Sequence, residues 1–226
     1  MTTIAKFAIT LTLSLLLVSC NFDMNWNTGV KGNGNVITTE RNASEEFTKI
    51  EVGRGLDVYI TQTDNSSISV EADENLQELI TTNISNGMLT ISATENIGAS
   101  KSKKVHVTLN KIELISASSG SDVYCSNIIK SPNLILETSS GSDLEVNVET
   151  ENLECNSSSG SDLKVSGITT NINAKASSGS DIKANNLTAE NGNAKASSGS
   201  DIRLNVSNKL SSKSSSGGSI RNVRKD

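Results

Sequence analysis

Aspartates recur at a fixed place in the second half of the chain and are the first candidates for chemistry. Each stands two residues after the glycine of a repeated Ser-Ser-Gly-Ser-Asp segment, and together they are Asp122, Asp143, Asp162, Asp181 and Asp201. If the repeats stack, neighbouring carboxylates lie roughly 5 Å apart and repel by about 1 kcal/mol even in bulk water. A Ca²⁺ ladder would offset this repulsion, because hard cations take several carboxylate oxygens. Gly-x-Asp repeats bind Ca²⁺ in other β-solenoids, although their nine-residue motif is not matched here.

A purely structural role for the aspartates is the favoured alternative. Ser and Asp side chains hydrogen-bond the backbone of turns. Basic residues two positions further along the same outward face could neutralise the column, and these are Lys164, Lys183, Arg203 and Arg221. Asp143 fits less well, because its corresponding neighbour is Glu145. We therefore favour a structural turn over a bound cation, and a bound cation over catalysis.

Other catalytic constellations are scarce. His106 is the only histidine and alternates outward on an expected strand, so neither a Ser-His-Asp site nor a zinc site has enough members. Paired carboxylates could still serve a polysaccharide lyase or hydrolase on a β-helix, although this rests on fold analogy alone. Aromatic residues make up only 3% of the chain, which leaves few rings for sugars to stack on. We expect no enzyme and no cofactor.

The N-terminus predicts export and a lipid anchor. Residues 1–19 carry Lys6 and then the apolar run from Phe7 to Val18, which is typical of a secretory signal and too short to span a membrane. Leu17-Val18-Ser19-Cys20 is similar to a lipobox, in which the cysteine is acylated, so Cys20 is the predicted lipidation site. The alternative is an ordinary signal followed by a chance cysteine. Residues 20–35 are predicted to form the lipidated cysteine and a flexible tether.

Two cysteines remain, Cys125 and Cys155. An exported protein invites a disulfide, but the two fall on different strands and two coils apart. Two coil spacings of about 4.8 Å exceed the Cα separation that a disulfide allows. We predict two buried free thiols.

The repeat also predicts the elements that position these side chains. Its glycines, up to a degenerate copy at Gly217, are 21, 19, 19, 20 and 18 residues apart, and such a period is typical of a solenoid. Period-two alternation of apolar and polar residues predicts strands with one inward face. The inward columns include Val123, Leu144, Leu163, Ile182, Ile202 and Ile220, and a column further along comprises Ile128, Val148, Ile168, Leu187 and Val206. The fold is therefore predicted to be all-β, a parallel β-helix with about 20 residues per coil.

The first half is also rich in alternating segments. We expect strands at 47–52, 56–62, 68–72, 88–93 and 105–109, with one short helical turn at 74–80. Residues 36–226 then form a single domain, in which 36–110 is a non-repetitive N-terminal part and 111–226 contains the repeat coils.

The order of these elements resembles a known family. Gly32-Asn-Gly-Asn-Val36, Phe47-Thr-Lys-Ile-Glu-Val-Gly53, Leu56-Asp-Val-Tyr-Ile-Thr-Gln62 and the Ser-Gly-Ser-Asp repeats are similar to the auto-transporter adhesin head GIN domain family (DUF2807), found mostly in Bacteroidota. The resemblance covers roughly residues 30–224. It implies a right-handed parallel β-helix, often lipid-anchored, with adhesion as the proposed role.

Composition and resemblance together favour a binding role. The net charge is −5, and it becomes −6 once the signal with Lys6 is removed, since 19 basic residues then face 25 acidic ones. This balance argues against nucleic-acid partners. We expect an exported lipoprotein of the outer membrane, with the lipid anchor in the membrane and an envelope protein, host surface or glycan as ligand. The alternatives are a β-helical carbohydrate-active enzyme and a structural protein that self-associates through its coil end.

Overall fold

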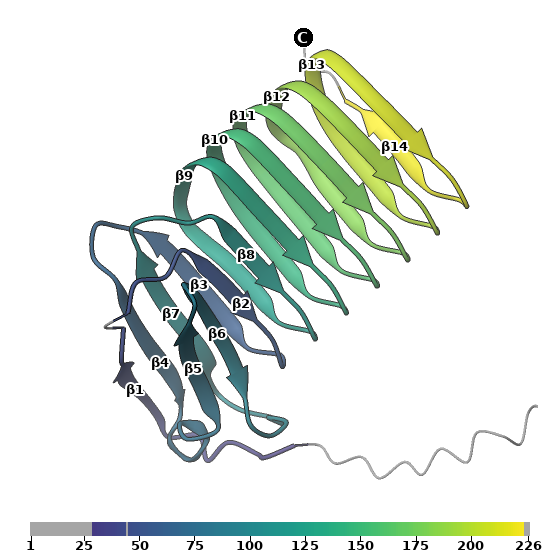
Figure 1. The fold of residues 1–226 in the computed structure, drawn as a ribbon. Helices are drawn as coiled ribbons and strands as arrows, with labels where there is room; N and C mark the ends of the chain where they lie inside the picture. The colour runs from purple at the N-terminus through teal and green to yellow at the C-terminus, as the bar shows by residue number, and fades with distance from the viewer. Residues whose placement is uncertain (1–28, 44, 224–226) are drawn as a thin grey trace, which may run out of the picture.

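The computed structural model describes residues 29–43 and 45–223, and Figure 1 shows that the repeats stack into a solenoid. Each repeat forms one long strand that winds round the molecule. These strands are β9 (Asp122–Thr138), β10 (Asp143–Ser157), β11 (Asp162–Ala176), β12 (Asp181–Ala196) and β13 (Asp201–Ser214), followed by the short β14 (Ser219–Asn222). Each pairs in parallel with the next. The predicted parallel β-helix with coils of about 20 residues is confirmed.

Stacking places the repeated columns one above another. Leu144 pairs with Val123 on one side and with Leu163 on the other, and Leu163 pairs with Ile182. All of these side chains are buried. A second inward column on the returning half of each coil behaves in the same way, with Leu153 between its neighbours in β9 and β11. The two halves of each coil share one apolar core, so the register inferred from the sequence is correct.

The Ser-Ser-Gly-Ser segment is a tight turn at one edge of each coil. In the third repeat Ser159 and Gly160 have φ values of 57° and 69°, the signs required at both central positions of a type I′ turn. Ser161 is buried, and its Oγ donates to the Ser158 carbonyl at 2.7 Å and accepts from the Ser158 N–H at 3.3 Å. In the next repeat the Oγ of Ser180 also donates to the Ser157 carbonyl of the preceding coil at 2.8 Å. The last serine of the motif therefore closes its own turn and ties neighbouring coils together.

The coil register continues into the N-terminal part, which the sequence led us to describe as non-repetitive. β2 (Lys49–Val52) pairs in parallel with β6 (Met88–Ala93) and β8 (Leu114–Ala117), and β3 (Asp57–Gln62) pairs in parallel with β7 (Lys103–Leu109) and β9. Arg54 and Gly55 between them have φ values of 58° and 68°, as in the serine turns. Residues 49–62 are therefore a degenerate coil. It lies between β6–β7 and β8–β9, so stacking order departs from chain order here.

Antiparallel strands close the N-terminal end of the solenoid. β1 (Val36–Arg41) pairs with β4 (Ser67–Asp73), β4 pairs with β7, and β5 (Ile80–Ser85) pairs with β6, all antiparallel. A 3-10 turn at Glu74–Leu76 lies within the short helical turn expected at 74–80. Within the described ranges no helix is long and apolar enough to cross a membrane.

The predicted flexible tether is too long at its C-terminal end. Residues 29–35 lie against the cap, where the Val30 N–H donates to the Asn96 carbonyl at 2.8 Å. The fully buried Asp73 accepts hydrogen bonds from the backbone N–H groups of Gly34, Lys101 and Ser102 at 2.8–3.1 Å. The composition rich in Asn and Gly serves here as an ordered, close-packed segment. The remainder of the predicted tether, residues 20–28, lies outside the described residues, and so does the predicted signal, residues 1–19.

Two members of one predicted inward column point to solvent instead. Ile128 is 47% exposed and Ile168 is 63% exposed, whereas Ile129 and Val148 are buried. Both stand eight residues after their glycine, an even offset that strict alternation places on the outward face. The uninterrupted register of β10 and β11 accordingly sets Gly167, and not Ile168, opposite the inward Val148. Leu187 has the same offset but is buried, because a one-residue bulge in β12 sets it opposite Gly167.

Both remaining cysteines are free thiols, as predicted. Cys155 is buried, whereas Cys125 is only partly buried and packs against the core. Burial raises the pKa of Cys125 to about 12 and also raises that of Cys155. Both thiols are therefore small core residues, unlike reactive cysteines, whose pKa is lowered.

Candidate functional site

The predicted aspartate column exists, and it is longer than the sequence indicated. Asp122, Asp143, Asp162, Asp181 and Asp201 pair with one another in order along the first half of the coils. Asp57 of the degenerate coil pairs with Asp122 and extends the column, and Lys104 then pairs with Asp57. The sequence missed Asp57 because its turn, Gly53-Arg54-Gly55-Leu56, shares one glycine and no serine with the repeat.

The two ends of the column differ electrostatically. Burial, and then the charge of Asp57, raise the pKa of Asp122, and burial followed by the charges of Asp122 and Asp162 raises the pKa of Asp143. Further along, Lys183 Nζ lies 2.6 Å from Asp162 and 3.8 Å from Asp181. The hydrogen bond to Asp162 raises the pKa of Lys183. A lysine thus compensates the column at Asp162 and Asp181, whereas repulsion between neighbouring carboxylates persists at Asp122 and Asp143.

The column is not a convergent metal site in the described residues. None of their His, Cys, Asp and Glu side chains gather in groups of three or more that could hold a metal ion. Of the basic residues expected to neutralise the column, Lys183 does so, whereas Lys164 pairs with Glu145 at 2.7 Å. The structure therefore supplies the charge compensation that a structural turn needs, and the Ca²⁺ ladder stays a prediction.

Three aromatic side chains stack on one another near the N-terminal end of this column. Each stands two residues after Asp57, Lys104 or Asp122 in its strand. The Tyr59 ring lies 5.3 Å from that of His106 and 5.4 Å from that of Tyr124, with interplanar angles of 20° and 25°. Tyr59 is the central ring, and the other two rings cover both of its faces, so Tyr59 offers an edge rather than a flat platform on which a sugar could stack. His106 Nε2 lies 3.8 Å from Glu71 Oε2, and its side chain is 43% exposed. It sits on the outward face as predicted.

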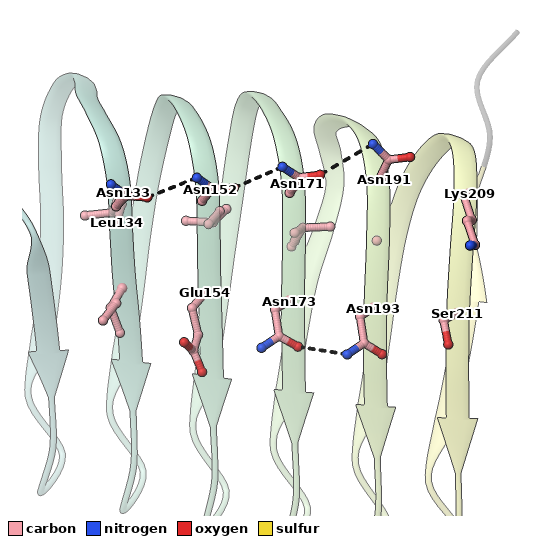
Figure 2. A pocket seen from close by; sticks show the side chains of 14 residues that line it. Asn133, Leu134, Asn152, Glu154, Asn171, Asn173, Asn191, Asn193, Lys209 and Ser211 are labelled. Carbon is pink, nitrogen blue, oxygen red and sulfur yellow. Dashed lines mark hydrogen bonds between the residues drawn. The ribbon is translucent and has the colours of Figure 1, made fainter.

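A groove of about 590 Å³ crosses the outer face of the returning halves of the coils (Figure 2). Two rows of outward side chains, two residues apart along each strand, form its walls, and the residues between them form its floor. The first wall is an asparagine row that we call the amide ladder, comprising Asn133, Asn152, Asn171 and Asn191. The second wall comprises Ile135, Glu154, Asn173, Asn193 and Ser211. We call this the amide groove.

Hydrogen bonds link the amide ladder from coil to coil, as Figure 2 shows. Asn152 Nδ2 donates to Asn133 Oδ1 at 3.0 Å, and Asn171 Nδ2 donates to Asn152 Oδ1 at 3.0 Å. Asn191 donates to Asn171 at 3.4 Å, and Asn208 donates to Asn191 at 3.0 Å. The ladder fixes the amides in one orientation along the groove.

A second groove, of about 690 Å³, continues the first toward the N-terminal cap. The two grooves share Asn133 and Ile135. Met88, Leu114 and Pro132 contribute apolar surface to the second groove. One continuous surface therefore extends from β13 to β6.

Sequence reasoning missed the amide groove, although a signal for it was present. Asn133, Asn152, Asn171 and Asn191 each stand eight residues before a repeat glycine, and Lys209 takes that place in the last copy. The outward positions were treated as polar filler, although asparagine recurs there in four successive repeats. Cys20, the predicted lipidation site, lies outside the described residues.

Comparison with known proteins finds one matching family and several similar structures. The family model described as "Putative auto-transporter adhesin, head GIN domain" matches residues 46–224. A "putative adhesin" from Bacteroides fragilis is 21% identical with a TM-score of 0.78, covering 86% of this chain and all of its own. A "putative lipid binding protein" from Parabacteroides distasonis is 17% identical with a TM-score of 0.65, covering 87% of this chain and 97% of its own. A "putative adhesin" from Parabacteroides merdae is 17% identical with a TM-score of 0.64, covering 86% and 99%. No curated protein matches significantly.

Proposed function

Because the chain belongs to the family of the "putative auto-transporter adhesin, head GIN domain", we propose that it is a non-catalytic, adhesin-type binding protein held at the cell envelope by a lipid on Cys20. The amide groove is the observation that carries the binding role. It repeats the same polar groups once per coil over several coils, and such a surface suits an extended ligand rather than a small substrate. The ligand is an envelope protein, a host surface or a glycan.

The geometry of the N-terminus supports a short tether to the membrane. Residues 29–35 are docked on the cap, so only residues 21–28 separate Cys20 from the domain. Eight fully extended residues span at most about 30 Å. The cap then faces the membrane, and the C-terminal coils point away from it (Figure 1). The amide groove runs along the side of the solenoid, where a ligand beyond the membrane could reach it.

The side chains that could do chemistry are arranged for structure instead. The aspartates form a line rather than a facing pair, and the Tyr59–His106 stack occupies the histidine ring. Glycosidases place two carboxyl groups on opposite sides of the bond they cleave. We therefore favour binding over the alternative of a polysaccharide lyase or hydrolase.

Expression of the full chain in a Gram-negative host tests the proposal in two parts. Metabolic labelling with an alkyne palmitate should mark the protein and should fail for Cys20→Ser. Cells displaying the wild-type chain should be retained under flow on a mucin film or an epithelial monolayer, and cells expressing Cys20→Ser should be washed off. Unlabelled wild-type protein would overturn the anchor. Equal retention of both strains, or turnover of an acidic polysaccharide by the purified chain, would overturn adhesion.

A further inference from the structure

The amide groove carries more information than a general binding surface, because its hydrogen-bonding capacity is defined. An asparagine side chain has two N–H donors and an oxygen with two lone pairs. In the interior of the ladder, Asn152 and Asn171 each use one donor toward one neighbour and one lone pair toward the other. Each rung therefore retains one donor and one acceptor, both held in place by the ladder.

The groove is close to neutral over its central coils. Glu154 is its acidic member, and its carboxylate lies 2.8 Å from Lys175 Nζ. That hydrogen bond lowers the pKa of Glu154, so the pair stays ionised and internally balanced. Asn173 and Asn193 continue the same wall without charge and are joined by a hydrogen bond of 3.4 Å. The basic residue Lys209 lies at the end of the groove. Lys175, Lys195 and Lys213 stack two residues beyond the second wall, outside the residues that line the groove, and the lysines Lys49, Lys111 and Lys130 line the second groove. A polymer lying on the amides themselves therefore meets no cation before Lys209.

The spacing of the rungs also restricts the ligand. Parallel strands lie about 4.8 Å apart, whereas successive residues of an extended polypeptide rise about 3.3 Å. A peptide lying along the groove would therefore lose register with the amides within a few residues. A chain of hydroxyl-bearing units fits better, because every hydroxyl can both donate and accept. Ile135, Leu114 and Pro132 lie where the amide groove joins the second groove and offer apolar surface to the C–H faces of such units.

Resting on the proposed binding function, we infer that the amide groove is a binding site for a linear, uncharged polysaccharide, which lies across the coils with its hydroxyl groups on the amide ladder. The acidic column and the stacked rings on the other half of the coil play no part in this contact.

Isothermal titration of the purified full chain, kept in a detergent without a sugar headgroup, tests the inference. The probes are the neutral polymers dextran, mannan, laminarin and xylan, beside the anionic polymers alginate and polygalacturonate. Wild type should bind at least one neutral polymer more tightly than either anionic one. Asn152→Asp and Asn171→Asp remove a donor and add charge to the groove, and each should weaken that binding about tenfold or more, as expected for the loss of one or two hydrogen bonds.

Asn147→Asp is the matched control, because it makes the same change on the exposed first half of β10, away from the groove. It should bind like wild type, and unchanged melting temperatures in all three variants would show that the fold is intact. Absence of neutral-polymer binding, a preference for the anionic polymers, or equal affinity in the groove variants would overturn the inference. Adhesion under flow that persists in Asn171→Asp would refute this ligand while leaving the adhesin function standing. Binding of dextran without adhesion under flow would refute the adhesin function and leave the polysaccharide site standing.

Discussion

Two glycines of β11 and its preceding turn allow the stacking register to be tested by the same substitution. Gly160 lies in the serine turn with φ of 69°, and a Cβ added there would meet nothing within 4 Å. Gly167 lies seven residues later with φ of 111°, and its added Cβ would come within 2.0 Å of the Val148 carbonyl oxygen of the neighbouring coil. Gly160→Ala thus tests backbone conformation alone, and Gly167→Ala also tests the approach of two coils.

The expected loss of stability is larger at Gly167 than at Gly160. An L residue in the left-handed region costs about 1–2 kcal/mol, so Gly160→Ala should lower the free energy of unfolding by about that amount. At Gly167 the backbone angle lies beyond the left-handed region and costs about 1–3 kcal/mol. Displacing the neighbouring backbone adds about 1–3 kcal/mol, as overpacking does elsewhere. We expect about 2–6 kcal/mol in total for Gly167→Ala.

Urea unfolding followed by circular dichroism measures both values, and thermal unfolding provides a second readout. In a domain of this size about 1 kcal/mol corresponds to 2–4 °C, so the melting temperature of Gly167→Ala should fall by about 10 °C. Labelling of the buried Cys155 thiol in a Cys20→Ser, Cys125→Ser background reports local opening of β10. Labelling should be faster in Gly167→Ala than in Gly160→Ala. Equal destabilisation by the two substitutions would refute the close contact between β10 and β11, and with it the register of the coils.

Three further predictions concern charge. Burial opposes ionisation of Asp73, but three backbone N–H donors outweigh this effect and lower the pKa of Asp73. The ionised carboxylate therefore stabilises the fold above the unfolded-state pKa, and this stabilisation is lost as the pH falls through the lower folded-state pKa. On acidification below about pH 4, wild type should therefore lose stability more steeply than Asp73→Asn. Urea titrations at several pH values would measure this difference. Parallel pH profiles of the two proteins would contradict the role of Asp73. Lys183→Met should reduce stability by no more than about 1 kcal/mol, because its ion pairs are partly exposed, with a smaller loss in high salt; a larger, salt-independent loss would point to packing instead. Added Ca²⁺ or EDTA should leave the melting temperature unchanged if the aspartate column is structural, and stabilisation by Ca²⁺ would restore the cation ladder.

The solenoid could be predicted from the sequence because a single local motif sets its register. Each Ser-Ser-Gly turn requires positive φ at its second serine and its glycine, and each turn buries its last serine, so motif and geometry repeat together. Leu144, Leu163 and Ile182 then had only one way to stack. The degenerate coil was missed for the complementary reason. Arg54 and Gly55 adopt the same φ values without the same residues, so the geometry persists where the sequence pattern does not.

One apolar column was assembled across a bulge in β12 that the sequence pattern does not reveal. Ile128 and Ile168 have the expected apolar character at nearly the expected offset, yet each faces solvent. Their exposure follows from strict alternation at an even offset from the glycine, whereas Leu187 at the same offset is buried by a one-residue bulge in β12, and such a bulge leaves no compositional mark. The same limitation applied to the Asn-rich and Gly-rich residues 29–35, which composition described as a tether. Their order depends on Asp73, about forty residues away in the chain.

The inward columns also bear on where a ligand can bind. One of them runs Ile115, Leu136, Cys155, Ala174, Ala194 and Ser212 from the cap to the last coil. Its side chains shrink toward the last coil and end in a hydroxyl, so this column offers little apolar surface at the open end. Lys209 and Lys213 on the same coil are exposed, and charged edge residues oppose strand addition. These charges favour the side of the solenoid, which the amide groove crosses, over the open end as the binding surface.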